Sequence, residues 1–330
     1  MYKENEYREF LEHHGMETEK INKYVESVYR AIQYFKDNNL ELVDGSVKDF
    51  QEYVAYLMKE GMNSYDELMA VGRYVYLLDL KEPWIYYAAI LGGTSVYPSI
   101  RDRLSKIAGS DVCDIIFSQV DVPPLGSDPD KYPEATFQLM KQLNKELPPE
   151  VYRRVLAGNH HRIPVEAFFI QRDWLQKLNG DIDAWLKKMH DASVAELEEH
   201  YKKDKVWYEQ VITRDIIDYV KNNQEILSGI RVGEWIYNTK FPYSPQRYLE
   251  ETDSRMKRFY MCHCPLARAA VLEDHPKIPM DWCYCSAGYG KLRYDVAFGE
   301  ETDVEVVESV FNGSDKCRFR IRIPEKWRTD

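Results

Sequence analysis

The sequence lacks the features that mark several large classes of protein. It has no run of about 18 apolar residues, so no membrane-spanning helix is expected. It has no glycine-rich phosphate loop, no serine nucleophile elbow and no His-Glu-x-x-His motif, which argues against an NTPase, a serine hydrolase or a zinc protease. The stretch MYKENEYREF is too polar for a secretory signal, and we therefore expect a cytoplasmic protein whose thiols stay reduced.

Basic residues are also fewer than acidic residues. The chain holds 44 Lys and Arg against 55 Asp and Glu, a net charge of −11. Residues 1–110 alone carry 13 basic and 18 acidic side chains, a net of 13 − 18 = −5. Because neutralised phosphates supply most of the affinity for nucleic acid, DNA or RNA is an unfavoured partner. A helical adaptor that binds DNA or protein stays as the second alternative function.

At 330 residues the chain is long for a single core, and two domains are expected. Residues 1–120 show apolar positions at the helical period, with N-cap signals at Ser46 and at Ser64, and predict a helical bundle. Residues 121–133 are rich in Pro, Gly and Asp and predict a linker. Residues 134–330 begin with helices and end with strands. The predicted fold class is therefore α+β, an all-helical N-terminal domain followed by an α+β domain.

The C-terminal part is where strands are expected. Its last segments read as an antiparallel hairpin, DVEVVESVF and CRFRIRI, joined through the turn signal Asn312-Gly313. In the second of these, Cys317, Phe319 and Ile321 would share one face of the strand. The other expected elements are a β segment over 229–243, a short strand over 256–262, and helices over 265–274 and 287–298.

The cysteines are unevenly distributed. Five of the six lie in the last 69 residues, and four of these form two Cys-x-Cys pairs. Side chains two apart in a strand face the same side, so Cys262 and Cys264 could meet Cys283 and Cys285 around one Zn²⁺ ion. His263 could join them if it lies in a loop. A one-residue spacer is a weaker zinc signal than Cys-x-x-Cys.

Three interpretations of these thiols stay open: silent core residues, a metal site, and a reactive thiol. Cys264 and Cys285 are the candidate catalytic residues, Cys264 because a helix is expected to start next to it. Nearby aromatic rings and one positive charge suit a pocket for a small, partly anionic organic ligand. Its candidate lining residues are Tyr260, Arg268, Trp282, Tyr284 and Tyr289.

Two further groups are weaker candidates. Lys240 and Arg231 lie among aromatic residues, a combination that can hold a carboxylate, although a strand with solvated charges is the plainer interpretation. His160 or His161 could approach the cysteines, although a capping role at the surface is the plainer interpretation for both.

The motifs carry a resemblance to known families. With its Cys-His-Cys-Pro motif the region 229–324 resembles an uncharacterised bacterial family. The ending VESVFNGSDKCRFRI is similar to the C-terminal hairpin of 4-vinyl reductase domains and of L-2-amino-thiazoline-4-carboxylic acid hydrolase-like proteins. This resemblance implies an α+β small-molecule-binding module with cysteines as metal ligands. Gly313, Cys317 and Phe319 match the pattern, and Ser309 stands where the family usually has a cysteine.

The first 80 residues resemble the helical core-binding domain of tyrosine recombinases. No Arg…His-x-x-Arg…Tyr arrangement follows them, so the catalytic half of such an enzyme is missing.

These observations lead to one expectation and one main alternative. We expect a cytoplasmic protein that binds or senses a small molecule in a pocket lined by cysteines and aromatic rings, with zinc as the candidate cofactor. The alternative is a hydrolase of a small cyclic or amide substrate that uses a cysteine nucleophile or a metal-bound water.

Overall fold

The computed structural model describes residues 2–273 and 277–328, and the chain divides into two compact units. The first comprises Met1–Gly92 with Pro123–Asp128, and the second comprises Gly93–Val122 with Pro129–Asp330. The sequence predicted the boundary at residues 121–133. In the structure the chain passes from the first unit to the second after Gly92, and only residues 123–128 of the predicted linker belong to the first unit again. None of the helices among the described residues is long and apolar enough to cross a membrane.

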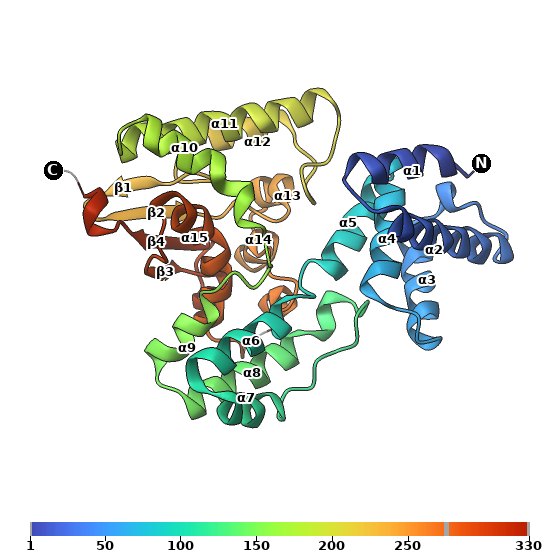
Figure 1. The fold of residues 1–330 in the computed structure, drawn as a ribbon, viewed down its shortest axis with the longest axis horizontal. Coiled ribbons are helices and arrows are strands. Elements are labelled where there is room, and N and C mark those ends of the chain that lie inside the picture. Colours follow the sequence, from blue (N-terminus) through green and yellow to red (C-terminus); the bar gives the residue numbers. More distant parts are fainter. Residues whose placement is uncertain (1, 274–276, 329–330) are drawn as a thin grey trace. The chain divides into compact units, whose positions relative to one another are not determined.

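The first unit is entirely helical in its described residues, as the sequence predicts (Figure 1). Its helices are α1 (Glu4–His13), α2 (Thr18–Asp37), α3 (Val47–Lys59), α4 (Tyr65–Leu77) and α5 (Lys81–Leu91), with a 3₁₀ turn at Leu42–Asp44. The faces predicted to be apolar meet in one core, in which Phe35, Phe50 and Tyr87 are almost fully buried.

Two predicted helix starts are confirmed by hydrogen bonds. The Ser46 hydroxyl accepts from the Asp49 backbone N–H in a complete capping box, and the Ser64 hydroxyl accepts from the Glu67 N–H. The Glu67 side chain does not close the second box. It is buried and instead accepts hydrogen bonds from Arg30 and from the Ser27 hydroxyl.

Part of the predicted linker packs on the first unit. The Asn63 side chain donates a hydrogen bond of 2.6 Å to the Leu125 carbonyl oxygen. Gly126 has a φ of +93°, and a Cβ there would lie 2.9 Å from a Val54 methyl group. This glycine therefore permits both the turn and the close approach of the segment to α3.

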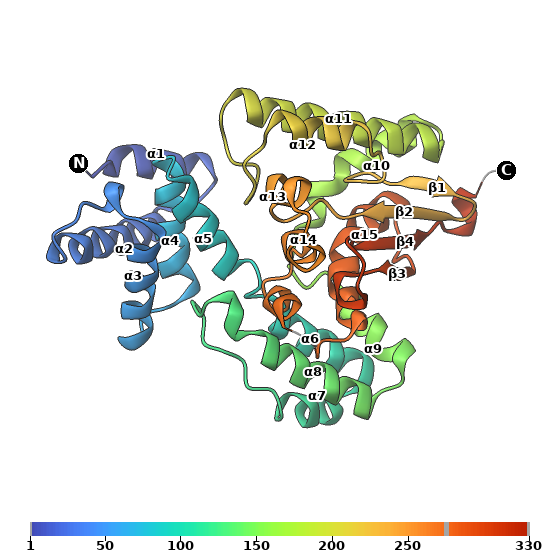
Figure 2. The same cartoon turned by 180° about the vertical axis from the view of Figure 1, so that it is seen from behind.

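The second unit holds ten helices among its described residues, together with short 3₁₀ segments. They are α6 (Val96–Ala108), α7 (Ser110–Phe117), α8 (Pro133–Glu146), α9 (Pro149–Leu156), α10 (Phe169–Lys177), α11 (Ile182–Lys202), α12 (Arg214–Lys221), α13 (Pro245–Glu250), α14 (Ser254–Met261) and α15 (Tyr284–Phe298). Figure 2 shows the same elements from behind.

The second unit also contains a four-stranded antiparallel sheet, which confirms the α+β class. Its strands are β1 (Ile230–Val232), β2 (Trp235–Thr239), β3 (Val304–Glu308) and β4 (Arg318–Arg322), in the order β1-β2-β4-β3. The predicted hairpin is present as β3 and β4, and a 3₁₀ turn with Gly313 at φ +92° connects them.

Helices α10, α11 and α15 cover one face of this sheet (Figures 1 and 2). Their side chains Leu175, Trp185 and Phe298 form one core with Ile236 of β2 and Ile321 of β4. The alternation predicted for β4 is confirmed, because its apolar residues are buried and its arginines lie on the other face, paired with acidic side chains. The sheet therefore gives α15 a rigid support.

Two predicted elements next to the cysteines are wrong. Residues 256–262 were expected as a strand but belong to α14 and its end, because the Asp253 side chain caps that helix by accepting from the Met256 N–H at 2.8 Å. The helix expected over 265–274 is only a 3₁₀ segment, Arg268–Leu272. The Cys264 carbonyl accepts from both the Ala267 and the Arg268 N–H, which makes a tight turn there. The end of that expected helix, 274, lies outside the described residues.

Candidate functional site

The two cysteine pairs come together, although not as strands. Cys262, Cys283, Cys285 and Cys317 lie in one hydrophobic core, and Cys264 packs against it. Cys262 follows α14, and Cys264 begins the tight turn after it. Cys283 ends the 3₁₀ helix Met280–Cys283, and Cys285 lies in the first turn of α15. The strand geometry on which the convergence was predicted is therefore wrong, because caps and turns take its place.

Three of the buried thiols form one end of the group. Cys262, Cys283 and Cys317, like Cys285, are each less than a tenth exposed. The sulfur of Cys283 lies 3.1 Å from the Ser309 hydroxyl oxygen. Burial raises the pKa of all three thiols, and for Cys262 and Cys283 the neighbouring Cys317 raises it further. At neutral pH the buried end is a set of protonated core thiols.

Cys264 marks the other, half-buried end. All six cysteines lie among the described residues, and Cys264 is the one that is not buried. The Trp282 indole N–H points at its sulfur at 3.2 Å. Burial raises the pKa of Cys264, whereas Trp282, the Leu266 backbone N–H, Lys240 and Arg268 lower it. The net pKa is raised, but the surroundings of this thiol are polar and positive.

Two positive charges lie within electrostatic reach of Cys264. Lys240 follows β2, donates to the Ser286 hydroxyl at 2.9 Å and lies 5.2 Å from the centre of the Tyr289 ring. Arg268 begins its 3₁₀ segment and lies 3.8 Å from the centre of the Tyr243 ring. We refer to Lys240, Tyr243, His263, Cys264, Arg268, Ser286 and Tyr289 as the cationic cluster.

Lys240 is the electrostatic centre of this cluster. Burial has the largest effect on the pKa of His263 and of the thiols Cys264, Cys285 and Cys317, and Lys240 lowers each of these pKa values. One ammonium group is thus within electrostatic reach of an imidazole and three sulfurs. It favours the neutral form of the imidazole and the thiolate form of the three thiols.

His263 is held as a neutral ring. Its Nε2 lies 2.6 Å from the Phe241 carbonyl oxygen, to which it donates, and its ring meets Tyr243 edge-on at 5.5 Å. Burial, with Lys240 nearby, lowers the pKa of His263 to about 3. This imidazole is uncharged at neutral pH, and its Nε2 is engaged by the backbone.

A close contact between α15 and the loop after α9 positions Ser286 and Tyr289, the cluster residues that α15 carries. A Cβ at Gly288 would lie 2.5 Å from the Ala157 carbonyl carbon, so only glycine allows α15 to reach the loop after α9. The same loop brings the His161 ring to 5.2 Å from Tyr289. Its neighbour His160 is buried and bonded through its ring nitrogens to Ser99 and to the Val155 carbonyl.

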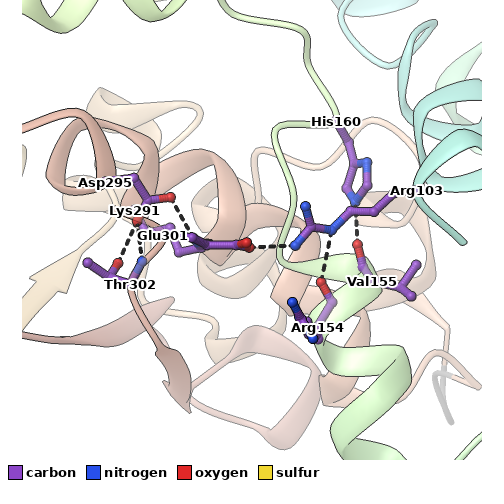
Figure 3. A network of polar contacts seen from close by, with 8 residues as sticks. All are labelled: Arg103, Arg154, Val155, His160, Lys291, Asp295, Glu301 and Thr302. Carbon is purple, nitrogen blue, oxygen red and sulfur yellow. Dashed lines mark hydrogen bonds and ion pairs between the residues drawn. The ribbon is translucent and has the colours of Figure 1, made fainter. Parts of the chain in front are cut away.

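A polar network fixes the far half of α15 (Figure 3). The Lys291 side chain is 2 % exposed and pairs with Asp295, whose carboxylate also accepts from the Thr302 hydroxyl at 2.6 Å. Arg103 of α6 pairs with Glu301 and donates to the Arg154 carbonyl at 3.1 Å. Burial raises the pKa of Asp295, while Lys291 and Thr302 lower it. All the polar groups in this network have partners, so we assign it a structural role.

The other predicted ligand residues are divided between two environments. Trp282 touches Cys264, and Arg268 and Tyr289 belong to the cationic cluster. Tyr260 lies on the last turn of α14, 5.8 Å from the Arg247 guanidinium. Tyr284 is buried beside Arg153, 5.5 Å away, which is itself bonded to Asp281.

The structure gives the zinc prediction no support. Within residues 2–273 and 277–328, no group of three or more His, Cys, Asp or Glu side chains is placed to hold a metal ion. Zinc prefers four ligands around one point. Among the residues predicted as ligands, His263, Cys264 and Cys283 each contact a different partner: the Phe241 carbonyl, the Trp282 indole and the Ser309 hydroxyl. The other two, Cys262 and Cys285, are buried in the same core.

A cavity of about 210 Å³ in the second unit lies elsewhere. It is lined by Arg255, Arg258, Val271, Glu273, Val310, Phe311 and Gly313. None of these is a clustered cysteine or a predicted ligand residue.

Sequence analysis missed three residues of the site. Ser286 and Tyr243 carried no signal beyond their proximity to cysteines and to Lys240. Glu209 lies some thirty positions before Lys240, yet burial raises its pKa, and Tyr243, Arg268 and Lys240 each lower it. The sequence around Lys240 was the one indication of a site in this region, because it combines a basic residue with aromatic residues, Tyr243 among them.

The comparisons with known proteins add one match. Residues 196–327 match a family model described as a family of unknown function (DUF6144). This region contains the five clustered cysteines and the whole cationic cluster. Among the curated proteins and among the solved structures nothing matches.

Proposed function

We propose that the second unit binds a small organic anion, a carboxylate, at the cationic cluster. The observation that carries the proposal is that Lys240 and Arg268, which come from separate segments, both lower the pKa of the same half-buried thiol, Cys264. Two cations within electrostatic reach of one partly buried group favour a bound anion there. A guanidinium can match a carboxylate in two parallel hydrogen bonds.

The aromatic residues of the cluster support an organic ligand. Arg268 stacks on Tyr243, and Lys240 lies over Tyr289, so each cation is held against a ring. Tyr289 is 37 % exposed, so part of its side chain is accessible to solvent. Apolar walls with a few placed polar groups are typical of small-molecule sites.

The state of the thiols favours binding over thiol chemistry. The Trp282 and Leu266 N–H groups would stabilise a thiolate at Cys264, which is the specific observation in favour of the hydrolase alternative. Burial outweighs them, and the pKa of Cys264 stays above its usual range. The thiol is therefore mostly protonated at neutral pH, and we propose that it lines the site.

Alkylation of Cys264 tests the proposal on the full chain. Iodoacetate and iodoacetamide attack thiols in the same way but differ by one negative charge. We expect the rate ratio of iodoacetate to iodoacetamide at Cys264, followed by peptide mass spectrometry at about pH 8.5, to exceed that of a free thiol such as N-acetylcysteine. Lys240→Met should lower the ratio by about three- to tenfold, because it removes one charge from a half-buried site.

The matched control is Lys187→Met, which removes the same charge from an exposed position on α11. It should leave the ratio unchanged. Benzoate, which carries a carboxylate and a ring, should protect Cys264 from iodoacetamide in the wild type and protect it less in Lys240→Met. A ratio equal to that of the free thiol and insensitive to Lys240 would refute anion binding at this cluster.

The other functional expectations stay predictions. The similarity to 4-vinyl reductase domains, the sensing role and the adaptor role are supported by sequence patterns alone. The zinc cofactor is likewise a sequence prediction, and elemental analysis of the purified protein tests it.

A further inference from the structure

The cavity of about 210 Å³ in the second unit combines apolar and charged lining residues. Three of them are apolar: Val271, Val310 and Phe311. Three are charged: Arg255, Arg258 and Glu273. The two valines are each 3 % exposed, whereas Arg255 and Glu273 lie at the surface. The cavity therefore has an apolar floor and a rim that carries both signs of charge, a combination that suits a small amphipathic molecule.

The walls of the cavity are held by contacts within the protein. The Arg255 Nη1 donates to the Leu272 carbonyl oxygen at 3.3 Å, which ties α14 to the end of the 3₁₀ segment Arg268–Leu272. The Ser309 hydroxyl accepts from the Phe311 backbone N–H at 3.1 Å and fixes the 3₁₀ turn between β3 and β4. The cavity is thus formed by the protein's own hydrogen bonds, and binding need not pay for ordering it.

Arg258 is the charged group best suited to a ligand. It lies three residues after Arg255 and hence on the same face of α14. Its guanidinium lies 4.0 Å from the Asp315 carboxylate, which is beyond hydrogen-bond length. A guanidinium that is paired so loosely can still offer a carboxylate two parallel hydrogen bonds.

The opposite charge at the rim narrows the class of ligand. The Glu273 carboxylate would repel a phosphate or another simple anion, and the two arginines would repel a simple cation. A zwitterion can pair with both signs, its carboxylate with a guanidinium and its ammonium group with Glu273. The rim therefore favours a ligand that carries both charges on one head group.

The volume of the cavity limits the rest of the ligand. An apolar cavity of about 150 Å³ holds a benzene ring. In proportion, the 210 Å³ measured here would hold about eight or nine non-hydrogen atoms, which is the size of leucine.

We infer that this cavity binds a free α-amino acid with a medium-sized aliphatic side chain. The side chain lies on Val271 and Val310, the carboxylate meets Arg258, and the ammonium group meets Glu273. This site is separate from the cationic cluster, so the inference goes beyond the proposed function and does not rest on it.

Calorimetric titration of the full chain with leucine and its analogues tests the inference. We expect one leucine to bind per chain. N-acetylleucine lacks the ammonium group and leucinamide lacks the carboxylate, and each should bind at least about tenfold more weakly. Tryptophan, which carries the same head group on a larger side chain, should not bind. These comparisons use the wild-type protein and so do not depend on the folding of any variant.

Two substitutions then locate the bound amino acid. Arg258→Met and Glu273→Gln should each weaken leucine binding by about ten- to hundredfold, because each removes one charged partner of the head group. Arg172→Met on α10 is the matched control. It removes an arginine that is paired as loosely, 3.9 Å from Asp173, and should leave leucine binding unchanged.

The other outcomes overturn the inference. Absence of saturable leucine binding up to about 1 mM would do so, as would equal binding of leucine, N-acetylleucine and leucinamide. If Lys240→Met weakens leucine binding and Arg258→Met does not, the amino acid occupies the cationic cluster. The inference is then wrong, whereas the proposed function stands. Failure of the alkylation test at Cys264 together with leucine binding that requires Arg258 would refute the proposed function alone.

Discussion

The two ends of the cysteine group place the same side chain in different chemical environments. At the buried end, Cys283 has a serine hydroxyl as its polar neighbour, and Cys317 continues the apolar face of β4. At the half-buried end, Cys264 faces an indole N–H and lies near Lys240 and Arg268. The difference shows that clustering of cysteines in a sequence indicates a shared location and leaves their chemistry undecided. The chemistry of each thiol is set by its polar neighbours, and most of these neighbours come from parts of the chain distant from the cysteine in sequence.

The largest effect on stability is expected from a substitution that disturbs the packing of α15, since both ends of the cysteine group depend on that helix. Gly288→Ala would force a Cβ to within 2.5 Å of the backbone of Ala157, which cannot give way as a flexible side chain could. We expect this substitution to lower the free energy of unfolding by an amount near the top of the range of about 1–3 kcal/mol that is typical of overpacking, measured by urea denaturation.

Gly290→Ala, on the same helix, is the matched control. Its Cβ would meet Phe319 at 3.8 Å, an ordinary contact, and alanine is the better helix former. This variant should be neutral or slightly stabilising. Equal losses in both variants would show that the close approach of α15 to the loop at Ala157 does not exist.

The contrast between the ends also explains which parts of the molecule could be predicted. The helices of the first unit and the final hairpin follow from local signals, such as the Ser46 cap and the alternation in β4. The strand expected at 256–262 failed because the Asp253 cap outweighed a run of aromatic residues. Convergence of the cysteines was predicted from a wrong local geometry, because the tertiary fold brings them together by other means.

Only some residues of the candidate site could be predicted from the sequence. Arg268, Tyr289 and Lys240 were noticed because they lie near cysteines or aromatic residues along the chain. Glu209 could not be found in this way, since only folding brings it to Tyr243 and Arg268. A carboxyl group contributed by a distant turn has no local signature.

The pH dependence of stability should come in part from the buried thiols. Burial raises the pKa of Cys262 and of Cys285 in the folded chain above the usual thiol range. Below about pH 8.5 both folded and unfolded chains keep these protons. Above it the unfolded chain loses protons that the folded chain retains, so the free energy of unfolding falls as the pH rises, by up to about 1.4 kcal/mol per pH unit for each thiol.

Urea denaturation between about pH 8 and 9 measures this slope while most tyrosines stay protonated. The comparison variant is Cys262→Ala with Cys285→Ala, which should lose stability overall but show a flatter slope. A slope identical to that of the wild type would mean that these thiols are solvated in the folded protein.

A smaller effect should separate the two ends directly. Cys317→Ser places a hydroxyl on the apolar face that Phe319 and Ile321 share, and we expect it to cost about 1–2 kcal/mol in the free energy of unfolding. Cys264→Ser places the same hydroxyl where the Trp282 N–H can donate to it, and should cost less than about 0.5 kcal/mol. Similar losses in the two variants would remove the distinction between a core end and a polar end.

The smallest effect is expected on removal of metal. The side chains of His263, Cys264 and Cys283 engage separate partners. In the part of the chain that the structure describes, the predicted ligands Cys262, His263, Cys264, Cys283 and Cys285 form no metal-holding group. We therefore expect elemental analysis of the freshly purified protein to find no stoichiometric zinc, and EDTA to leave the thermal unfolding midpoint unchanged. Bound zinc would deprotonate its thiols and draw their sulfurs to about 2.3 Å from one ion. One zinc per chain, lost together with stability on chelation, would therefore mean that both ends of the cysteine group are parts of a single metal site, and the comparison between them would no longer hold.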